Sequence, residues 1–177
     1  MEPQQVLILG EVLWDCFAGD VEKFGGAPIN FAANLARFGR EPIVISALGD
    51  DERGSRAREE FTRLGISLDG IQTVDADTGI ATIAETDPPY TFNSPAAWDL
   101  IDGAAALKYL RSIKADPEYI CFGTLALRNE DGPTRAALLA ILEAFPDAKK
   151  VLDINLRKPH EDGALCTQLF REVNILK

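Results

Sequence analysis

The segment Phe24–Gly39, FGGAPINFAANLARFG, joins a double glycine to an alanine-rich helix. Glycine-rich turns at helix N-termini commonly bind anions, because backbone N–H groups point outward there. The two usual nucleotide loops are nevertheless excluded. No G-x-G-x-x-G follows the first predicted strand, and Gly26 is followed by Ala27 and Pro28 in place of the lysine and Ser/Thr of a Walker loop. The turn has to be interpreted from its own residues.

Four residues of this turn suit the binding of a small polar ligand. Gly25 and Gly26 lack a Cβ, which allows their backbone to approach a ligand closely. Pro28 fits the first helical position, where its missing N–H costs nothing. Asn30 falls in the first turn, and its amide could both donate to and accept from a hydroxyl-rich ligand. An ordinary helix start with solvated asparagines explains the same pattern equally well.

Asp15 is a second candidate, in the segment GEVLWDCF that leaves the first predicted strand. In open α/β sheets, ligands gather beyond the carboxyl ends of the strands. A carboxylate at that place can accept hydrogen bonds from two neighbouring hydroxyls of a sugar. The alternative is a turn aspartate that bonds its own backbone, which is the commoner use of aspartate in loops.

A third group of polar residues ends a later strand, in the segment LDINLRKPHEDG. Asp153, Asn155 and Arg157 alternate along the chain, so in an extended strand they point to one side. A carboxylate, an amide and a guanidinium on one face predict a polar wall for a ligand. A strand that leaves the core and turns polar would show the same pattern, and the two readings are equally supported.

Further candidates are single residues at strand ends or helix starts. Tyr90 and Phe92 lie on one side of a short predicted strand, where they could close over a ligand or only pack a small sheet. Arg128 follows the strand-end segment FGTLAL. Asp51 is well placed to cap the helix that follows it.

The elements that must position these residues alternate between strand and helix. Short apolar runs predict strands, and amphipathic segments predict helices, one of them with an apolar stripe of Phe31, Leu35 and Phe38. The predicted strands are QVLILG, PIVISALG, YICFGT, KVLDIN and a last one beginning in VNILK, and the helices cover residues 27–38, 50–65, 104–113, 134–145 and 164–173. Such alternation predicts a parallel sheet with helices on both faces.

The stretch from Ile66 to Trp98 differs in character. Its pieces IQTV, GIATIAET and YTFN are short and threonine-rich, and Asp, Gly and Pro separate them. This pattern is typical of small antiparallel strands. We expect them to form an edge or lid, together with the segment EVLWDCFAGDVEKF near the start of the chain.

The composition excludes several classes of function. The 177 residues carry a formal net charge of −10, which argues against a surface for nucleic acid or an anionic membrane. Cys16, Cys121 and Cys166 are far apart and match no metal spacing, so they suit a reducing cytoplasm. The N-terminus does not read as a signal peptide, and no apolar run reaches membrane-spanning length. Because the chain stops where a strand begins, we expect an incomplete domain.

Together these segments resemble the pfkB (ribokinase-like) family of carbohydrate kinases along the whole chain. The resemblance rests on GEVLWD, GGAPINFAANLARFG, LGDDERG, TGIATI, FGTLALR and DINLR. Residues Gly25 to Gly49 satisfy the family's N-terminal signature, with Asn30, Ala32 and Gly39 at the required offsets. GEVLWD and D-x-N-L-R are most similar to the fructokinase branch.

The resemblance implies a ribokinase-like, three-layer α/β/α fold with a small β lid over the sugar. It implies sugar contacts for the residues Asp15, Gly25, Gly26 and Asn30, with Phe92, Arg128 and Arg157 bordering the same pocket. In this family ATP supplies the phosphoryl group, Mg²⁺ bridges its phosphates and an aspartate deprotonates the acceptor hydroxyl. Partners would be a sugar and ATP, with a homodimer through the lid.

The family's N-x-x-E motif and its glycine-rich anion hole with the catalytic aspartate would follow residue 177. We therefore expect residues 1–177 to be an incomplete kinase domain, with lid segments near 12–24 and 71–98 and without a catalytic base or metal ligand. Alone, this chain is expected to be inactive. The alternatives are a non-catalytic sugar-binding relative of such a kinase, or a nucleoside or 2-keto-3-deoxygluconate kinase of the same family.

Overall fold

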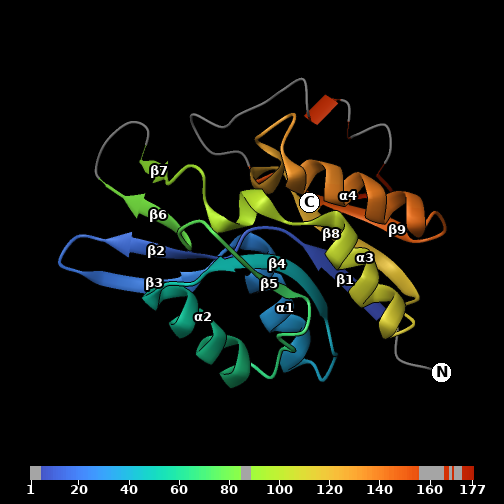
Figure 1. Ribbon diagram of the computed structural model, residues 1–177, viewed down its shortest axis with the longest axis horizontal. Coiled ribbons are helices and arrows are strands. Elements are labelled where there is room, and N and C mark those ends of the chain that lie inside the picture. The colour runs from blue at the N-terminus through green and yellow to red at the C-terminus, as the bar shows by residue number, and fades with distance from the viewer. Residues whose placement is uncertain (1–4, 85–88, 156–165, 168, 170–172) are drawn as a thin grey trace.

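A six-stranded parallel sheet forms the centre of the molecule in a computed structural model that describes residues 5–84, 89–155, 166–167, 169 and 173–177 (Figure 1). All neighbouring strands in it are parallel, as the sequence predicts. Its order is β10 (Ile175–Leu176), β9 (Lys149–Asp153), β8 (Pro117–Gly123), β1 (Gln5–Leu9), β4 (Ile43–Gly49) and β5 (Ile71–Val74). The carboxyl ends of these strands therefore meet at one edge.

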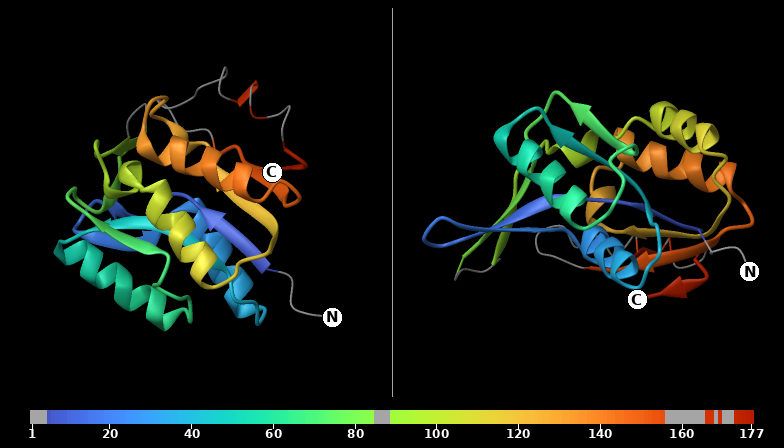
Figure 2. Two further views of the ribbon diagram at one scale, coloured as in Figure 1. Left: turned by 45° about the vertical axis from the view of Figure 1, so that its right-hand side comes forward. Right: turned by 90° about the horizontal axis from the view of Figure 1, so that it is seen from below.

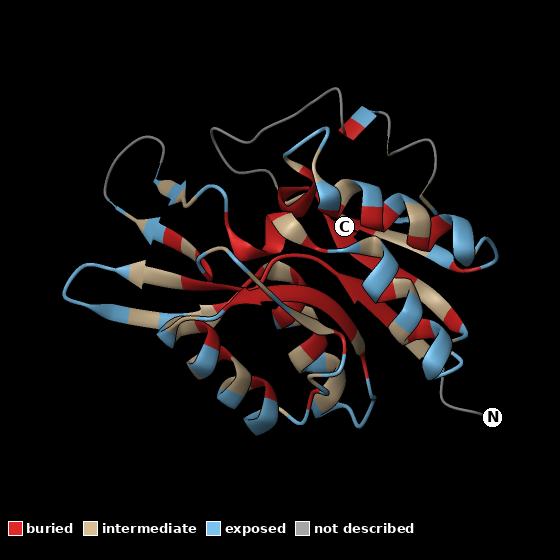
Figure 3. Ribbon diagram, viewed as in Figure 1, coloured by how far each residue is buried: buried red, intermediate tan, exposed pale blue. Residues whose placement is uncertain are grey.

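Helices cover both faces of this sheet. Helices α1 (Ala27–Arg37) and α2 (Glu52–Arg63) pack on one face, and α3 (Gly103–Ser112) and α4 (Pro133–Ala144) on the other. Figure 2 shows α3 and α4 on the side of the sheet opposite α1. Side chains of the central strand alternate between the two layers, with Leu7 and Leu9 in one core and Ile8 in the other. The central strands are buried on both faces, which explains their continuous apolar sequences (Figure 3).

Helix α1 buries the predicted apolar face only in part. Its fully buried residues are Pro28, Ile29 and Ala32, while Phe38 is 84% exposed. The predicted stripe was wrong at Phe38 because this residue is the C-cap, where the chain leaves the helix, and Gly39 with φ +71° turns it away from the sheet. The other two members of the predicted stripe, Phe31 and Leu35, are partly buried and pack against the same core as Ile29 and Ala32, so the prediction fails only at Phe38.

A second sheet of four short strands projects beyond the main one (Figure 1). Its order is β3 (Val21–Gly25), β2 (Leu13–Phe17), β6 (Gly79–Ile83) and β7 (Tyr90–Phe92). The prediction of an antiparallel sheet was wrong in one pair, because β2 and β6 run parallel. The IQTV strand also differs from expectation: as β5 it follows α2 and extends the parallel sheet beside β4, in the usual way of a β-α-β crossover.

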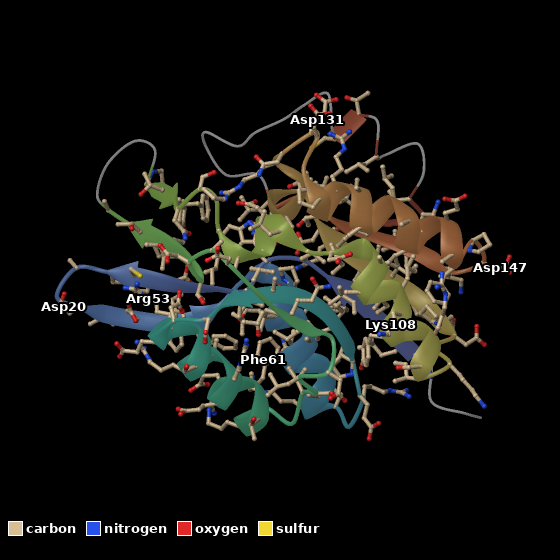
Figure 4. The ribbon with its side chains drawn as sticks, in the orientation of Figure 1. Asp20, Arg53, Phe61, Lys108, Asp131 and Asp147 are labelled. Atoms are coloured by element: carbon tan, nitrogen blue, oxygen red, sulfur yellow. The ribbon has the colours of Figure 1, made fainter. Side chains whose placement is uncertain are left out.

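Polar contacts tie the small sheet to the N-terminus of α2. The Asp51 side chain accepts from Gly54 N at 2.6 Å, which confirms the predicted cap, and it also accepts from Thr78 N at 2.7 Å just before β6. On β3, the Glu22 carboxylate forms ion pairs with Arg53 at 2.7 Å and with Arg56 at 2.8 Å, both of which lie on α2. Arg53 is in the first turn of α2, near β3 (Figure 4). Charged side chains thus attach the small sheet to the N-terminal part of α2.

The part of the chain beyond β9 is described only in pieces. Residues 166, 167 and 169 are helical, inside the helix that the sequence predicts for 164–173. The strand predicted at the end of the chain is present as β10. Within the described ranges, no helix is long and apolar enough to cross a membrane.

Candidate functional site

A cavity of about 480 Å³ lies between the carboxyl edge of the main sheet and the small sheet. Three structural parts contribute to its wall: the strand ends, the first turns of α1, and the inner face of the small sheet. The lining residues are Glu11, Leu13, Asp15, Gly26, Ala27, Asn30, Phe31, Asn34, Ala81, Tyr90, Phe92, Leu125, Asp153, Asn155 and Lys177. This is the edge at which open α/β sheets bind their ligands.

The double glycine at the start of α1 lies in close contact with other residues of the cavity wall. Gly26 has φ +111°, and a Cβ there would stand 2.4 Å from the carbonyl oxygen of Glu11. A Cβ on Gly25 would stand 3.1 Å from Asp15 Oδ2 and 4.0 Å from Asn30 Nδ2. Gly26 is therefore required by close approach and by its backbone conformation, and the absent side chain at position 25 leaves room between Asp15 and Asn30.

The inner face of the small sheet explains why Asp15 and Phe92 line one cavity. In the strand register Asp15 is opposite Ala81, and Ala81 is opposite Phe92. Directly opposite residues project to the same face of a sheet. Asp15, Ala81 and Phe92 consequently form one row across β2, β6 and β7 that faces α1 and Asn30.

The predicted polar wall at the end of β9 is present in part. Asp153 and Asn155 line the cavity, and Lys177 Nζ donates to Asp153 Oδ2 at 2.7 Å. Arg157, the third member, lies outside the described residues. Lys177 was missed because only the pairing of β10 with β9 brings it beside Asp153.

Arg128 is not among the lining residues, and the structure gives it different contacts from the predicted sugar contact. Its guanidinium donates to Asp99 Oδ1 at 3.1 Å, to Asp99 Oδ2 at 2.6 Å and to the Asn93 carbonyl at 2.8 Å. The side chains of Arg128 and Asp99 are only 4% and 2% exposed. Arg128 also lies over the Trp98 ring, 5.1 Å from its centroid. It joins the loop after β7 to the main body.

Glu11 is a cavity residue that our sequence reading missed. It follows β1 and Gly10, is 1% exposed, and accepts from Ala27 N at 3.3 Å through Oε1. Burial raises the pKa of Glu11 to about 7, against the lowering effect of the Ala27 N–H, and Asp153 raises it further while Arg128 lowers it. The available signal was an acidic residue two positions after a mainly apolar strand, where burial of a carboxylate is unfavourable unless it has partners.

The charges of the wall are mainly negative. Among the described lining residues, Glu11, Asp15 and Asp153 are acidic and Lys177 is the one basic side chain, already paired with Asp153. No group of three or more His, Cys, Asp or Glu side chains in the described part of the chain could hold a metal ion. We therefore assign no magnesium ligand among the described residues.

A family model agrees with this arrangement. The model described as "pfkB family carbohydrate kinase" matches residues 18–177. A probable fructokinase-4 from Arabidopsis thaliana is 30% identical over 149 residues, which cover 80% of this chain and 44% of that protein. The chain thus spans less than half the length of this curated relative.

Solved sugar-kinase structures share the fold. A fructokinase from Xylella fastidiosa with bound ATP superimposes with a TM-score of 0.75 at 24% identity, covering 90% of this chain and 51% of that one. A fructokinase from Vibrio cholerae O395 with fructose, ADP and calcium gives a TM-score of 0.77 at 17% identity, covering 98% and 59%. The chain therefore has the ribokinase-like α/β fold, a six-stranded parallel sheet with a second small sheet.

Proposed function

Because this chain belongs to the pfkB family of carbohydrate kinases, we propose that it forms the sugar-binding part of an ATP-dependent kinase for a neutral sugar such as fructose. The single observation that carries this proposal is the cavity in which Asp15, Gly26 and Asn30 meet beneath the small sheet. A carboxylate and an amide side by side suit a ligand with adjacent hydroxyl groups. The same residues are those for which the family resemblance implies sugar contacts.

The charge of the cavity supports a neutral sugar over an anionic one. Three carboxylates, on Glu11, Asp15 and Asp153, line it against the single amino group of Lys177 among the described lining residues. A phosphate or carboxylate on the ligand would be repelled in a partly buried site, where charges are weakly screened. A sugar hydroxyl can donate to each carboxylate without that cost.

Each part of the wall has a separate task in this proposal. Asp15 and Asn30 bind hydroxyls and orient the sugar, and Phe92 packs against its apolar edge. The small sheet covers the sugar and excludes water, so that the phosphoryl group passes to the sugar and not to solvent. ATP with Mg²⁺ would supply the phosphoryl group. Transfer of this type depends mainly on positioning and charge stabilisation. We assign neither a catalytic base nor an ATP-binding residue to the described part of the chain.

Asp15 provides the first test of this function. In the full-length protein, Asp15→Ala should abolish fructose-dependent ADP production, because the sugar loses its carboxylate acceptor. Glu130→Gln is the matched control, since the Glu130 side chain is 84% exposed and lies away from the cavity. Unchanged turnover in the Asp15 variant would remove Asp15 from the site. Turnover by residues 1–177 alone would contradict our expectation that this part only binds the sugar.

A ligand panel separates the alternatives within the family and also tests binding without catalysis. Fructose, ribose, adenosine, 2-keto-3-deoxygluconate and fructose 6-phosphate would be compared by thermal shift, since stabilisation grows as the ligand exceeds its dissociation constant. We expect stabilisation by fructose and none by the two anionic sugars. Stabilisation by 2-keto-3-deoxygluconate alone would contradict a neutral sugar as the substrate and would indicate an anionic sugar acid.

The small sheet also presents apolar side chains to solvent. Phe17 and Val21, on either side of the β2–β3 turn, are 36% and 48% exposed. We propose that this part of the small sheet contacts a second copy of the chain, which would remove both side chains from water. Sedimentation should then give the mass of a dimer, and Val21→Lys should give a monomer. A monomeric wild-type protein at high concentration would refute this contact.

A further inference from the structure

Glu11 has a buried oxygen that its surroundings leave without a hydrogen bond. Oε1 accepts from Ala27 N at 3.3 Å, whereas Oε2 is buried and has no hydrogen-bond partner among the described residues. A buried acceptor in that condition has lost its hydration without gaining a hydrogen bond, which is unfavourable. Buried polar atoms normally have partners in native structures, so this one needs an explanation.

The position of Glu11 supplies that explanation. It lines the same cavity as Asp15 and Asn30, directly after β1 at the carboxyl edge of the sheet. Gly123 at the end of β8 places no side chain beside this oxygen, and a Cβ there would stand 3.9 Å from Oε2. Glu11 is itself a lining residue of the cavity, which brings a bound ligand next to its carboxyl group.

We propose that Glu11 is a substrate-binding residue whose Oε2 accepts a hydrogen bond from a hydroxyl of the sugar. This inference rests on the proposed sugar-binding function. It adds to Asp15 on β2 a second carboxylate contact, from the segment that follows β1. A neutral polyol supplies the required donor, whereas a phosphate or carboxylate group at this place supplies none.

The charged groups around Glu11 set how this contact depends on pH. Asp153 at the end of β9 disfavours the ionised form, Arg128 favours it, and burial raises the pKa of Glu11 to about 7. Asp15 on β2 and Lys177, paired with Asp153, face the same cavity. The N-terminus of α1 also favours the anion. A hydroxyl that donates to Oε2 binds the carboxylate more strongly than the acid, so sugar affinity should rise as pH increases through 7.

The test is calorimetric titration of D-fructose into the full chain between pH 6 and 8.5, for wild type and four variants, namely Glu11→Gln, Glu11→Met, Asp15→Asn and Glu130→Gln. Glu11→Gln keeps the shape and can still accept from Ala27 N–H, but it cannot ionise. We expect it to bind fructose about tenfold more weakly at pH 8, with no dependence on pH. Glu11→Met, of similar size and without an acceptor, should bind more weakly still, and Glu130→Gln should match wild type.

The outcomes separate this inference from the proposed function. Fructose binding by wild type that Asp15→Asn abolishes, but that is unchanged in Glu11→Gln and Glu11→Met at pH 8, would overturn the role of Glu11 alone. The same pH dependence in wild type and Glu11→Gln would also overturn it. No binding of any neutral sugar by wild type would instead refute the proposed function. Circular dichroism of each variant shows whether a loss comes from unfolding.

Discussion

The buried ion pair between Arg128 and Asp99 should be a main determinant of stability. Arg128→Met leaves the Asp99 carboxylate in a site where it is 2% exposed, with Ala96 N as its remaining donor at 2.9 Å. Removing one partner of a buried pair costs about 3 to 5 kcal/mol, because the other charge stays buried and unpaired. For a chain of this size that loss corresponds to a fall in Tm of roughly 6 to 20 °C.

The assay is urea unfolding followed by tryptophan fluorescence, since Trp98 lies directly against the Arg128 guanidinium. Arg63→Met is the matched control, because Arg63 is 69% exposed in its pair with Glu60. An exposed pair of this kind contributes about 0 to 1 kcal/mol. The double variant Arg128→Met/Asp99→Asn should be more stable than the sum of its single variants, since the introduced amide carries no charge and its oxygen can still accept from Ala96 N.

Two results would refute this reasoning. If Arg128→Met unfolds within about 0.5 kcal/mol of wild type, the range usual for surface substitutions, the buried pair does not stabilise the fold. If the variant keeps its stability and loses fructose affinity, Arg128 contacts the sugar as the sequence predicts. The two roles therefore give opposite patterns in unfolding and binding experiments.

Three further substitutions test the turn, the buried acid and the root of the small sheet, each by urea unfolding. Gly26→Ala should lower the free energy of unfolding by about 2 kcal/mol or more, because φ is +111° and the new Cβ would clash with the Glu11 carbonyl. Folding raises the pKa of Glu11 to about 7, so this residue stabilises the fold most below pH 4.5, where it is protonated. The free energy of unfolding of wild type should therefore fall by about 2 to 3 kcal/mol as pH rises from 5 to 7, and that of Glu11→Gln should not. Asp51→Ala should cost about 2 kcal/mol at pH 7. Burial raises the pKa of Asp51, but hydrogen bonds from Thr78 and Gly54 hold it below its ordinary value of 3.8, so the difference from wild type should shrink as pH falls below that value.

The main sheet could be predicted from the sequence because its strands are buried on both faces. QVLILG and PIVISALG became β1 and β4, whose apolar side chains enter both cores. Such strands have continuous apolar sequences, which the chain shows directly. Local signals also sufficed for the start of α2, since Asp51 caps it through a contact three residues away.

Elements whose placement depends on distant contacts were predicted less well. Two stripes of α1 have helical spacing, and only the position of the sheet decides that Ile29 and Ala32 are buried while Phe38 is exposed. β5 has the short, threonine-containing sequence of a small-sheet strand, yet it pairs with β4. Its place follows from the crossover through α2, which a local pattern does not contain.

The candidate site also contains residues that could be predicted from the sequence and residues that could not. Asp15, Gly25, Gly26, Asn30 and Phe92 come together around one cavity, as the resemblance to a known family implied. Their roles in binding stay predictions. The motif identified these positions because it carries information from related sequences, whereas periodicity alone left each of them open.

Arg128 and Glu11 show what neither motif nor pattern supplied. Both follow apolar segments, so each looks like a polar residue at a strand end. The difference lies in their partners: Arg128 has Asp99 and the Asn93 carbonyl, which occupy most of its donors, while Glu11 Oε2 has none among the described residues. Arg128 Nη1 is also buried without a partner among the described residues, but Arg128 does not line the cavity, whereas the unpartnered acceptor of Glu11 belongs to a lining residue.

The anchors of the small sheet connect stability to the cavity. Arg128 donates to the Asn93 carbonyl at 2.8 Å, immediately after β7, and Asp51 accepts from Thr78 N at 2.7 Å, immediately before β6. The Asn93 side chain joins these two points, since it donates to the Thr78 carbonyl at 3.3 Å and accepts from Ile80 N at 2.8 Å. The β6–β7 pair, which carries Phe92 to the cavity, is thus held at its base by two charged side chains of the main body. Neither Arg128 nor Asp51 lines the cavity, so a loss of sugar affinity that accompanies a loss of stability in either variant would act through the position of this strand pair.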